Sequence, residues 1–239
     1  MNIVIPMAGL GSRFSDAGYT TPKPFIEIEG KPMILEAVNT LGFEGNYIFI
    51  IRKDEYIKNK MKEIFPKSQI IEVDYLTDGP ASSVMLAKEF INNDEELIVA
   101  NCDQIMWWDA ETVIKQIRVM DYDGVVVTYH ETTPKNSYAR INRRGHVTKM
   151  AEKQVISNVS LNGIHYWKKG KYFVESTESM VEKNIRFNNE FYVSLTYNQM
   201  IEKGLKVGIY HIPNEFHNAV GTPDDLNRYF EKISTYESL

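Results

Sequence analysis

The first fourteen residues, MNIVIPMAGLGSRF (1–14), decide the fold expected for this chain. Residues 2–7 form a short apolar run that ends in a loop with two glycines, which is typical of a buried strand followed by a turn. Such glycines let the backbone approach a ligand and direct N–H groups at a phosphate. The loop is not a GxGxxG motif, because Phe14 stands at the third glycine position, and it is not a P-loop. By itself it fits a plain Gly-rich βα turn equally well.

Strand-like and helix-like segments alternate about four times over the first hundred residues. The expected strands are 2–7, 47–51, 69–73 and 97–100, and the expected helices are 33–41, 54–65 and 78–91, the last with Asp78 as its N-cap. Strands this apolar, joined by helices, predict a parallel sheet covered on both faces. Ligands bind such sheets at the carboxyl ends of the strands, where the 8–13 loop and Asp103 lie.

The pattern changes in the second half of the chain. Strand-like segments separated by turns favour an antiparallel arrangement there, and they are 124–129, 138–142, 146–150 and 160–167. The apolar segment 206–212 comes later, after the helices expected in this half. Helices are expected near 170–183 and 194–203. A last helix begins at Thr222, where Thr-Pro-Asp-Asp places an N-cap, a first-turn proline and two acids in order.

Composition narrows the classes of function. The chain has 239 residues and a formal net charge of −5, so it lacks the excess of basic residues that nucleic-acid binding requires. Its one cysteine, Cys102, excludes an intrachain disulfide framework, and the five histidines show no zinc-ligand spacing. The first apolar stretch breaks at Pro6 and Gly9, too short for a signal sequence or a membrane span. A cytoplasmic protein without membrane or nucleic-acid partners is expected.

A second motif makes the glycine loop specific. Pro22-Lys23-Pro24 stiffens the backbone around one lysine, and Gly30-Lys31-Pro32 follows. The loop, the P-K-P lysine and the G-K-P helix start, in this order and spacing, resemble the sugar-nucleotide pyrophosphorylases, nucleotidylyltransferases with a GT-A-like fold. The resemblance implies a three-layer α/β/α fold with a mostly parallel central sheet. It also implies one domain over 1–239, with an NTP-binding half (1–105) and an acceptor-binding half (106–239).

The resemblance covers nearly the whole chain and implies a role for each matching residue. The implied catalytic residues are Arg13, Lys23 and Asp103, with Asp103 as the ligand of Mg²⁺. The implied NTP-binding residues are Ala8, Gly9, Leu10, Gly11, Ser12, Gly79, Pro80 and Ala81. The implied acceptor-binding residues are Glu152, Lys153, Gly163 and Glu190. The implied reaction joins the α-phosphate of an NTP to a small phosphomonoester, most of all a sugar 1-phosphate, and releases pyrophosphate, for surface polysaccharide or related biosynthesis.

Three positions depart from the family pattern. Pro80 replaces a threonine near the nucleobase, and Gln154 replaces the proline of an E-K-P motif. Ala219 stands where many members carry an aspartate as a second metal ligand, beside the closing Gly-Thr-Pro at 221–223. The chain therefore resembles a divergent subgroup. Related enzymes that load phosphocholine or a phosphorylated amino acid such as phosphoglutamine with CTP give the alternative acceptor class.

Other readings stay open at this point. A glycosyltransferase of related fold would carry a D-x-D motif, which Asn101-Cys102-Asp103 lacks, whereas a catalytically inactive regulatory subunit would agree with Ala219. Trp107-Trp108 fits either an acceptor wall or core packing. Lys135 and Arg140 fit either substrate contacts or surface charges. The sequence does not choose the nucleobase, the acceptor or the oligomeric state, and a homo-oligomer is one of the open options.

Overall fold

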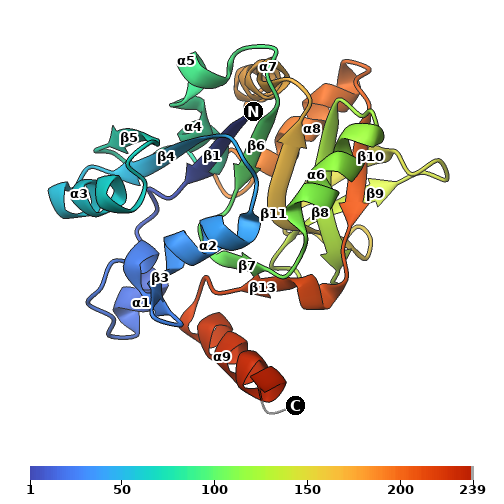
Figure 1. Cartoon of the computed structure of the whole chain (residues 1–239). Helices are drawn as coiled ribbons and strands as arrows, with labels where there is room; N and C mark the ends of the chain where they lie inside the picture. The colour runs from blue at the N-terminus through green and yellow to red at the C-terminus, as the bar shows by residue number, and fades with distance from the viewer. Residues whose placement is uncertain (238–239) are drawn as a thin grey trace.

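The computed structural model describes residues 1–237 and places four parallel strands side by side in one half of a larger sheet (Figure 1). Their order across the sheet is β6 (Leu97–Ala100), β1 (Asn2–Pro6), β4 (Asn46–Arg52) and β5 (Gln69–Val73). Strand β1 pairs in parallel with both β4 and β6, and β4 pairs in parallel with β5. The opening apolar run is therefore the buried central strand that the sequence predicted.

An antiparallel half continues the same sheet on the other side of β6. Its antiparallel strands are β8 (Gly124–His130), β9 (Ser137–Ile141), β10 (Val147–Glu152) and β11 (Val159–Trp167). Strand β12 (Val207–His211) also belongs to this half, but it pairs with β8 in parallel. Strand β11 joins the two halves, because it pairs antiparallel with β6 on one edge and with β8 on the other. Two short pairs stand apart from this sheet, β2 (Glu27–Ile28) with β3 (Lys31–Pro32), and β7 (Gln104–Met106) with β13 (His217–Ala219).

Helices cover both faces of the sheet because its strands are apolar on both sides. Alternate residues of β1 divide between the faces, with Val4 in one core cluster and Ile3 and Ile5 in the clusters opposite. The first face carries α4 (Pro80–Met85), α5 (Lys88–Ile91), α7 (Gly170–Glu182) and α8 (Val193–Glu202). The second face carries α2 (Met33–Leu41), α3 (Glu55–Ile64) and α6 (Ala110–Val119). The predicted α/β fold, with a parallel core and an antiparallel second half, is confirmed.

Short helices and the last helix lie along the carboxyl-end side of the parallel strands. They are α1 (Ser12–Asp16), η1 (Lys23–Phe25), η2 (Asn214–Phe216) and α9 (Pro223–Glu237). Helix α9 projects away from the sheet in Figure 1 and packs Leu226 and Tyr229 against Phe14. The Thr222 hydroxyl accepts a hydrogen bond from the Asp225 N–H at 3.1 Å, which confirms the predicted cap.

Two local predictions were incomplete. Asp78 does not cap a helix: α4 begins after Gly79 without a side-chain cap, and the Asp78 carboxylate pairs with Arg186 at 3.1 Å. The expected 78–91 helix is instead divided into α4 and α5. Helix α6 was not predicted from the sequence, although Asp109 caps it.

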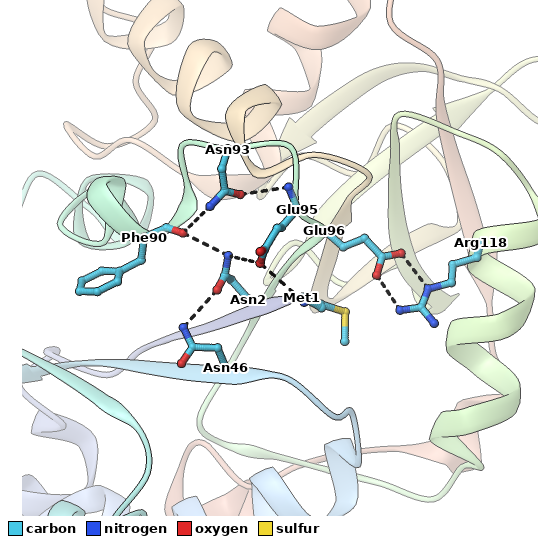
Figure 2. A network of polar contacts seen from close by, with 8 residues as sticks. All are labelled: Met1, Asn2, Asn46, Phe90, Asn93, Glu95, Glu96 and Arg118. Carbon is cyan, nitrogen blue, oxygen red and sulfur yellow. Dashed lines mark hydrogen bonds and ion pairs between the residues drawn. The ribbon is translucent and has the colours of Figure 1, made fainter.

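Polar contacts fasten the opposite, amino end of the parallel strands (Figure 2). The Asn2 side chain donates to the Phe90 carbonyl at 3.1 Å and accepts from the Asn46 amide at 3.1 Å. Close by, Arg118 forms a two-pronged ion pair with Glu96, at 2.6 and 2.8 Å. These bonds join β1 to β4 and α5, and α6 to the residue before β6, at the end of the sheet away from the glycine loop, so we assign them a structural role.

Candidate active site

A polar cleft opens where the carboxyl ends of the parallel strands meet the antiparallel half. It offers about 370 Å³ of solvent-accessible volume, within the range of small-molecule sites. Both halves of the chain supply its walls, from Pro6 and Arg13 near the first strand to Tyr192 and Ser194 at the start of α8. The expected ligand position at the strand ends therefore coincides with a cavity.

The glycine loop and the P-K-P lysine are packed together. Gly11 has a left-handed backbone (φ 64°) and caps α1, and a Cβ at this position would lie 3.3 Å from the Cβ of Lys23. The loop itself runs beside the cleft, with Ala8 buried and Leu10 exposed. Arg13, on α1, reaches the cleft wall. The sequence grouping of Arg13 with Lys23 is thus matched in space.

Lys23 and Asp103 form an ion pair across eighty residues of sequence. The Lys23 Nζ lies 2.5 Å from the Asp103 Oδ2, and the two side chains are 20% and 25% exposed. Burial by itself lowers the pKa of Lys23, but the Asp103 charge and hydrogen bond outweigh it, so the pKa is raised. The lysine is therefore a permanent cation beside the only carboxylate that follows β6 directly.

Gly221 fits closely over Asp103. A Cβ at Gly221 would lie 2.6 Å from the Asp103 Oδ2, and the Val220 N–H donates to the Asp103 carbonyl at 2.9 Å. Any larger residue at Gly221 would displace the carboxylate. The closing Gly-Thr segment thus packs directly against Asp103 and fixes its position, which explains why the motif needs glycine here.

The segment at Gly79 is joined to the segment before α8. Gly79 has φ 107°, and a Cβ there would lie 2.7 Å from the Phe191 carbonyl. The Ala81 N–H donates to that carbonyl at 3.0 Å, and the Phe191 N–H donates to the Asp78 carbonyl at 2.7 Å. Pro80 lines the cleft between them. These two hydrogen bonds join the Gly79 segment, in the first half of the chain, to the Phe191 segment in the second half.

Glu152 is a buried carboxylate in the cleft wall. Its side chain is 5% exposed and accepts hydrogen bonds from Ser137 and, at 2.8 Å, from Ser194. Burial raises the pKa of Glu152, and the two serine hydrogen bonds offset this in part. A carboxylate held this firmly, at the end of β10 and against Ser194 of α8, is a fixed hydrogen-bond acceptor for a ligand.

Lys153 lies at the rim of the cleft over an aromatic shelf. Its Nζ donates to the Tyr192 hydroxyl at 3.0 Å and lies 5.0 Å from the centre of that ring. The Tyr192 hydroxyl donates in turn to Glu190 at 2.6 Å. The expected acceptor residues Lys153 and Glu190 are thus linked through Tyr192, which lines the cleft.

The surroundings of Ala219 contain one further carboxylate. Ala219 lines the cleft, and so does Asp225 from the first turn of α9. Both Asp225 oxygens are engaged, one by the Thr222 hydroxyl at 2.6 Å and the other by Arg228. Among residues 1–237, no group of three or more His, Cys, Asp or Glu side chains is placed to hold a metal.

Several cleft residues were not singled out from the sequence. Gln104, Asn162, His165 and His217 line it, and none belongs to a motif. Gly163, itself an expected site residue, leaves space for Asn101 and Gln104: with φ 94°, a Cβ there would lie 2.0 Å from Asn101 Nδ2 and 3.1 Å from Gln104 Oε1. Antiparallel pairing of β11 with β6, and of β13 with β7, brings these residues together, and no local spacing reveals it.

The sequence left two interpretations open for several charged and aromatic residues, and the structure decides between them. Lys135 lines the cleft, whereas Arg140 is exposed on β9 outside it. Trp108 donates to the Thr40 carbonyl at 3.0 Å, and Trp107 packs against Tyr229 of α9, so the pair forms packing contacts and not a wall of this cleft. Burial raises the pKa of Cys102 to about 12, so its thiol stays protonated and is no nucleophile.

Three features define the class of this protein: the order of the strands, the glycine loop after the first strand, and the cations Arg13 and Lys23 beside it. The domain is that of a nucleotidyltransferase. Residues 3–162 match the family model described as the MobA-like NTP transferase domain, and the chain belongs to this family.

Individual relatives agree with this class. The chain is 27% identical over 245 residues to the bifunctional protein GlmU of Methanocaldococcus jannaschii, across 98% of this chain and 56% of that protein. The chain thus spans about half the length of this curated relative. A solved nucleoside-diphosphate-sugar pyrophosphorylase from Vibrio cholerae RC9 superposes with a TM-score of 0.82 at 25% identity, covering 96% of this chain and 99% of that one.

A third relative matches only part of the chain. The 2-aminoethylphosphonate cytidylyltransferase of Lancefieldella rimae is 31% identical over 104 residues, 41% of each chain. Separately, within residues 1–237 none of the helices combines the length and apolar character needed to cross a bilayer.

Proposed function

We propose that this chain transfers a nucleotidyl group from an NTP to a small phosphomonoester, chiefly a sugar 1-phosphate, and releases pyrophosphate. The sugar nucleotide formed would serve surface polysaccharide or related biosynthesis. The observation that carries the proposal is the convergence of Arg13, the Lys23–Asp103 pair and buried Glu152 on one cleft at the strand ends. The names of two relatives that match nearly the whole of this chain, GlmU and the pyrophosphorylase, agree with it.

The reaction needs positioning and charge neutralisation more than proton transfer. An oxygen of the ionised acceptor phosphate attacks the α-phosphorus, the bond to the bridging oxygen breaks, and its electron pair leaves with pyrophosphate. Arg13, which lines the cleft, and Lys23, which pairs with Asp103, would be the cations that balance the charge collecting on the leaving group. The raised pKa of Lys23 keeps that charge through the working pH range.

The donor set fits a hard cation such as Mg²⁺. Asp103 would hold it, and Asp225 is the next carboxylate in the cleft. Mg²⁺ commonly takes one or two protein carboxylates and completes its shell with water and substrate phosphates, so a site without a cluster of three ligands agrees with it. When bound, Mg²⁺ would neutralise charge on the phosphate oxygens.

We assign NTP binding to residues 1–105 and acceptor binding to residues 106–239. The glycine loop at 8–12 and the Gly79–Ala81 segment would hold the NTP, with Pro80 against the base. Glu152, Lys153, Gly163 and Glu190 would hold the acceptor. The hydrogen bonds between the Gly79 segment and Phe191 support cooperation between the halves, since they connect the two binding segments directly.

An amine-bearing acceptor is the second candidate. The shelf of Tyr192 with Glu190 already accommodates an ammonium group, that of Lys153, and the partial relative acts, by its name, on 2-aminoethylphosphonate. Glu190→Gln separates the two classes. The variant should weaken an amine-bearing acceptor strongly, because a charge pair is lost, and a sugar phosphate only modestly.

The direct test is a grid of four NTPs against a panel of sugar 1-phosphates, phosphocholine and aminoethyl phosphate esters, read by pyrophosphate release with Mg²⁺ present. Turnover of one NTP with a sugar 1-phosphate is the expected result. Tight NTP binding without pyrophosphate release for any acceptor would favour an inactive regulatory subunit instead.

A further inference from the structure

Unpartnered buried polar atoms gather in the active-site cleft. Seven buried side-chain N or O atoms in the described residues lack a hydrogen-bond partner, and four of the seven belong to Gln104, His165 and His217, which line this one cavity. Buried polar groups are nearly always paired in folded proteins, because leaving them unpaired is costly. Their concentration here indicates that a ligand completes them.

Gln104 is the most informative of the three residues. It is 3% exposed, it follows Asp103 directly, and neither its Nε2 nor its Oε1 has a partner. Gly163 leaves the amide accessible from the cleft, since a Cβ there would lie 3.1 Å from the Gln104 Oε1. The amide thus offers two donors and an acceptor next to the proposed reaction centre.

His165 on β11 adds one further unpartnered polar atom to the cleft. It is 7% exposed, and burial lowers its pKa to about 3, so the ring is neutral and carries one N–H donor and one acceptor nitrogen. The ring packs against both Trp167 and Tyr197, with centroids 5.9 and 5.7 Å away, and these two rings are themselves stacked at 4.8 Å, which fixes the plane of the histidine. Its Nδ1 has no partner.

These properties select one ligand chemistry. A phosphate accepts but does not donate, so it would leave the Gln104 Oε1 unpaired, and an ammonium donates but does not accept, so it would leave the Nε2 unpaired. A hydroxyl group both donates and accepts and completes both atoms. We propose that Gln104 and His165 are specificity-determining residues that read hydroxyl groups of a neutral polyol part of the acceptor, which deepens the proposed function and rests on it.

The test replaces Gln104 by methionine, which keeps the length of the side chain and removes its polar atoms. The matched control is Gln69→Met, at an exposed position on the far strand β5. Binding of sugar phosphates and of their monodeoxy analogues is measured by calorimetry, and pyrophosphate release is measured in parallel. NTP affinity and melting temperature are recorded for each variant.

Gln104→Met should weaken the fully hydroxylated acceptor by about 10- to 100-fold and leave NTP affinity unchanged. For one monodeoxy analogue, wild type and variant should bind equally, because the hydroxyl that Gln104 reads is already missing. The melting temperature should stay the same or rise, since an unpaired amide is removed. His165→Phe, which retains the stacking, should show the same loss with a different deoxy analogue.

Equal weakening of every acceptor and deoxy analogue, a loss of NTP affinity, or use of amine-bearing acceptors alone would overturn the inference. The two proposals fail separately. Gln104-dependent binding of hydroxylated acceptors without pyrophosphate release would remove the transfer reaction and leave the recognition residues in place. Pyrophosphate release from sugar phosphates that Gln104→Met does not alter would do the reverse.

Discussion

Replacing Lys23 by methionine should increase the affinity of the nucleotide-free protein for divalent cations while it abolishes turnover. The Lys23 ammonium lies 2.5 Å from the Asp103 oxygen that would hold Mg²⁺, so lysine and metal compete for one carboxylate. An NTP resolves the competition, because its phosphates attract the lysine and share the metal. Methionine fills the same half-buried space without a charge.

The size of the increase in metal affinity follows from the free energy that the Lys23–Asp103 ion pair contributes. An exposed pair contributes about 0–1 kcal/mol, and breaking a fully buried one costs about 3–5 kcal/mol. With side chains 20% and 25% exposed, a net value of about 1–2 kcal/mol is reasonable for this pair. Asp103 is then free of lysine about 3–20% of the time, so removing the lysine should tighten metal binding about 5- to 30-fold.

Mn²⁺ titration followed by electron paramagnetic resonance measures this affinity without turnover. The control is Lys31→Met, which removes the same charge from an exposed lysine paired with Glu36. The Lys23 variant should bind Mn²⁺ more tightly than both wild type and the control, and NTP more weakly. Metal affinity that is unchanged or reduced in Lys23→Met would refute the competition between lysine and metal for Asp103.

Three further variants test the acceptor side. Lys153→Ala should raise the acceptor KM about tenfold with little change in NTP affinity, and an equal loss of NTP affinity would argue against its assigned role. Lys135→Ala should raise the acceptor KM several-fold without changing the melting temperature, because the side chain is exposed and lines the cleft; Arg140→Ala, outside the cleft, should do neither. Glu152→Gln should stabilise the protein more at pH 8 than near pH 4.5. Burial raises the folded-state pKa of Glu152 above its ordinary value of 4.5, so ionisation at higher pH lowers stability. Differential calorimetry at both pH values would show a constant gain if this is wrong.

The features predicted from the sequence are those with a local cause. Neighbouring residues determine the local geometry of three such features: the apolar run at 2–7, the glycine loop and the proline-flanked Lys23. The parallel order of strands follows from strand–helix alternation. Asp78 was misassigned because its carboxylate, suited by type to an N-cap, pairs with Arg186, which is distant in sequence.

The parts of the site that were missed depend on pairing between distant strands. Gln104 and His165 meet in one cleft only because β11 returns antiparallel beside β6. Tyr192 supports Lys153 across 39 residues of sequence. Neither contact leaves a periodic pattern, and an unpartnered buried amide can be recognised only once its surroundings are known.

The central claim is tested most directly by identifying both products of one reaction. Wild-type protein, Mg²⁺, the preferred NTP and a sugar 1-phosphate are incubated, and mass spectrometry and a pyrophosphate assay quantify the products. We predict a nucleoside diphosphate-sugar and pyrophosphate in equal amounts, and the loss of both by about 10²-fold or more in Asp103→Asn. Pyrophosphate accompanied by free NMP, or equal product formation by Asp103→Asn, would contradict the account.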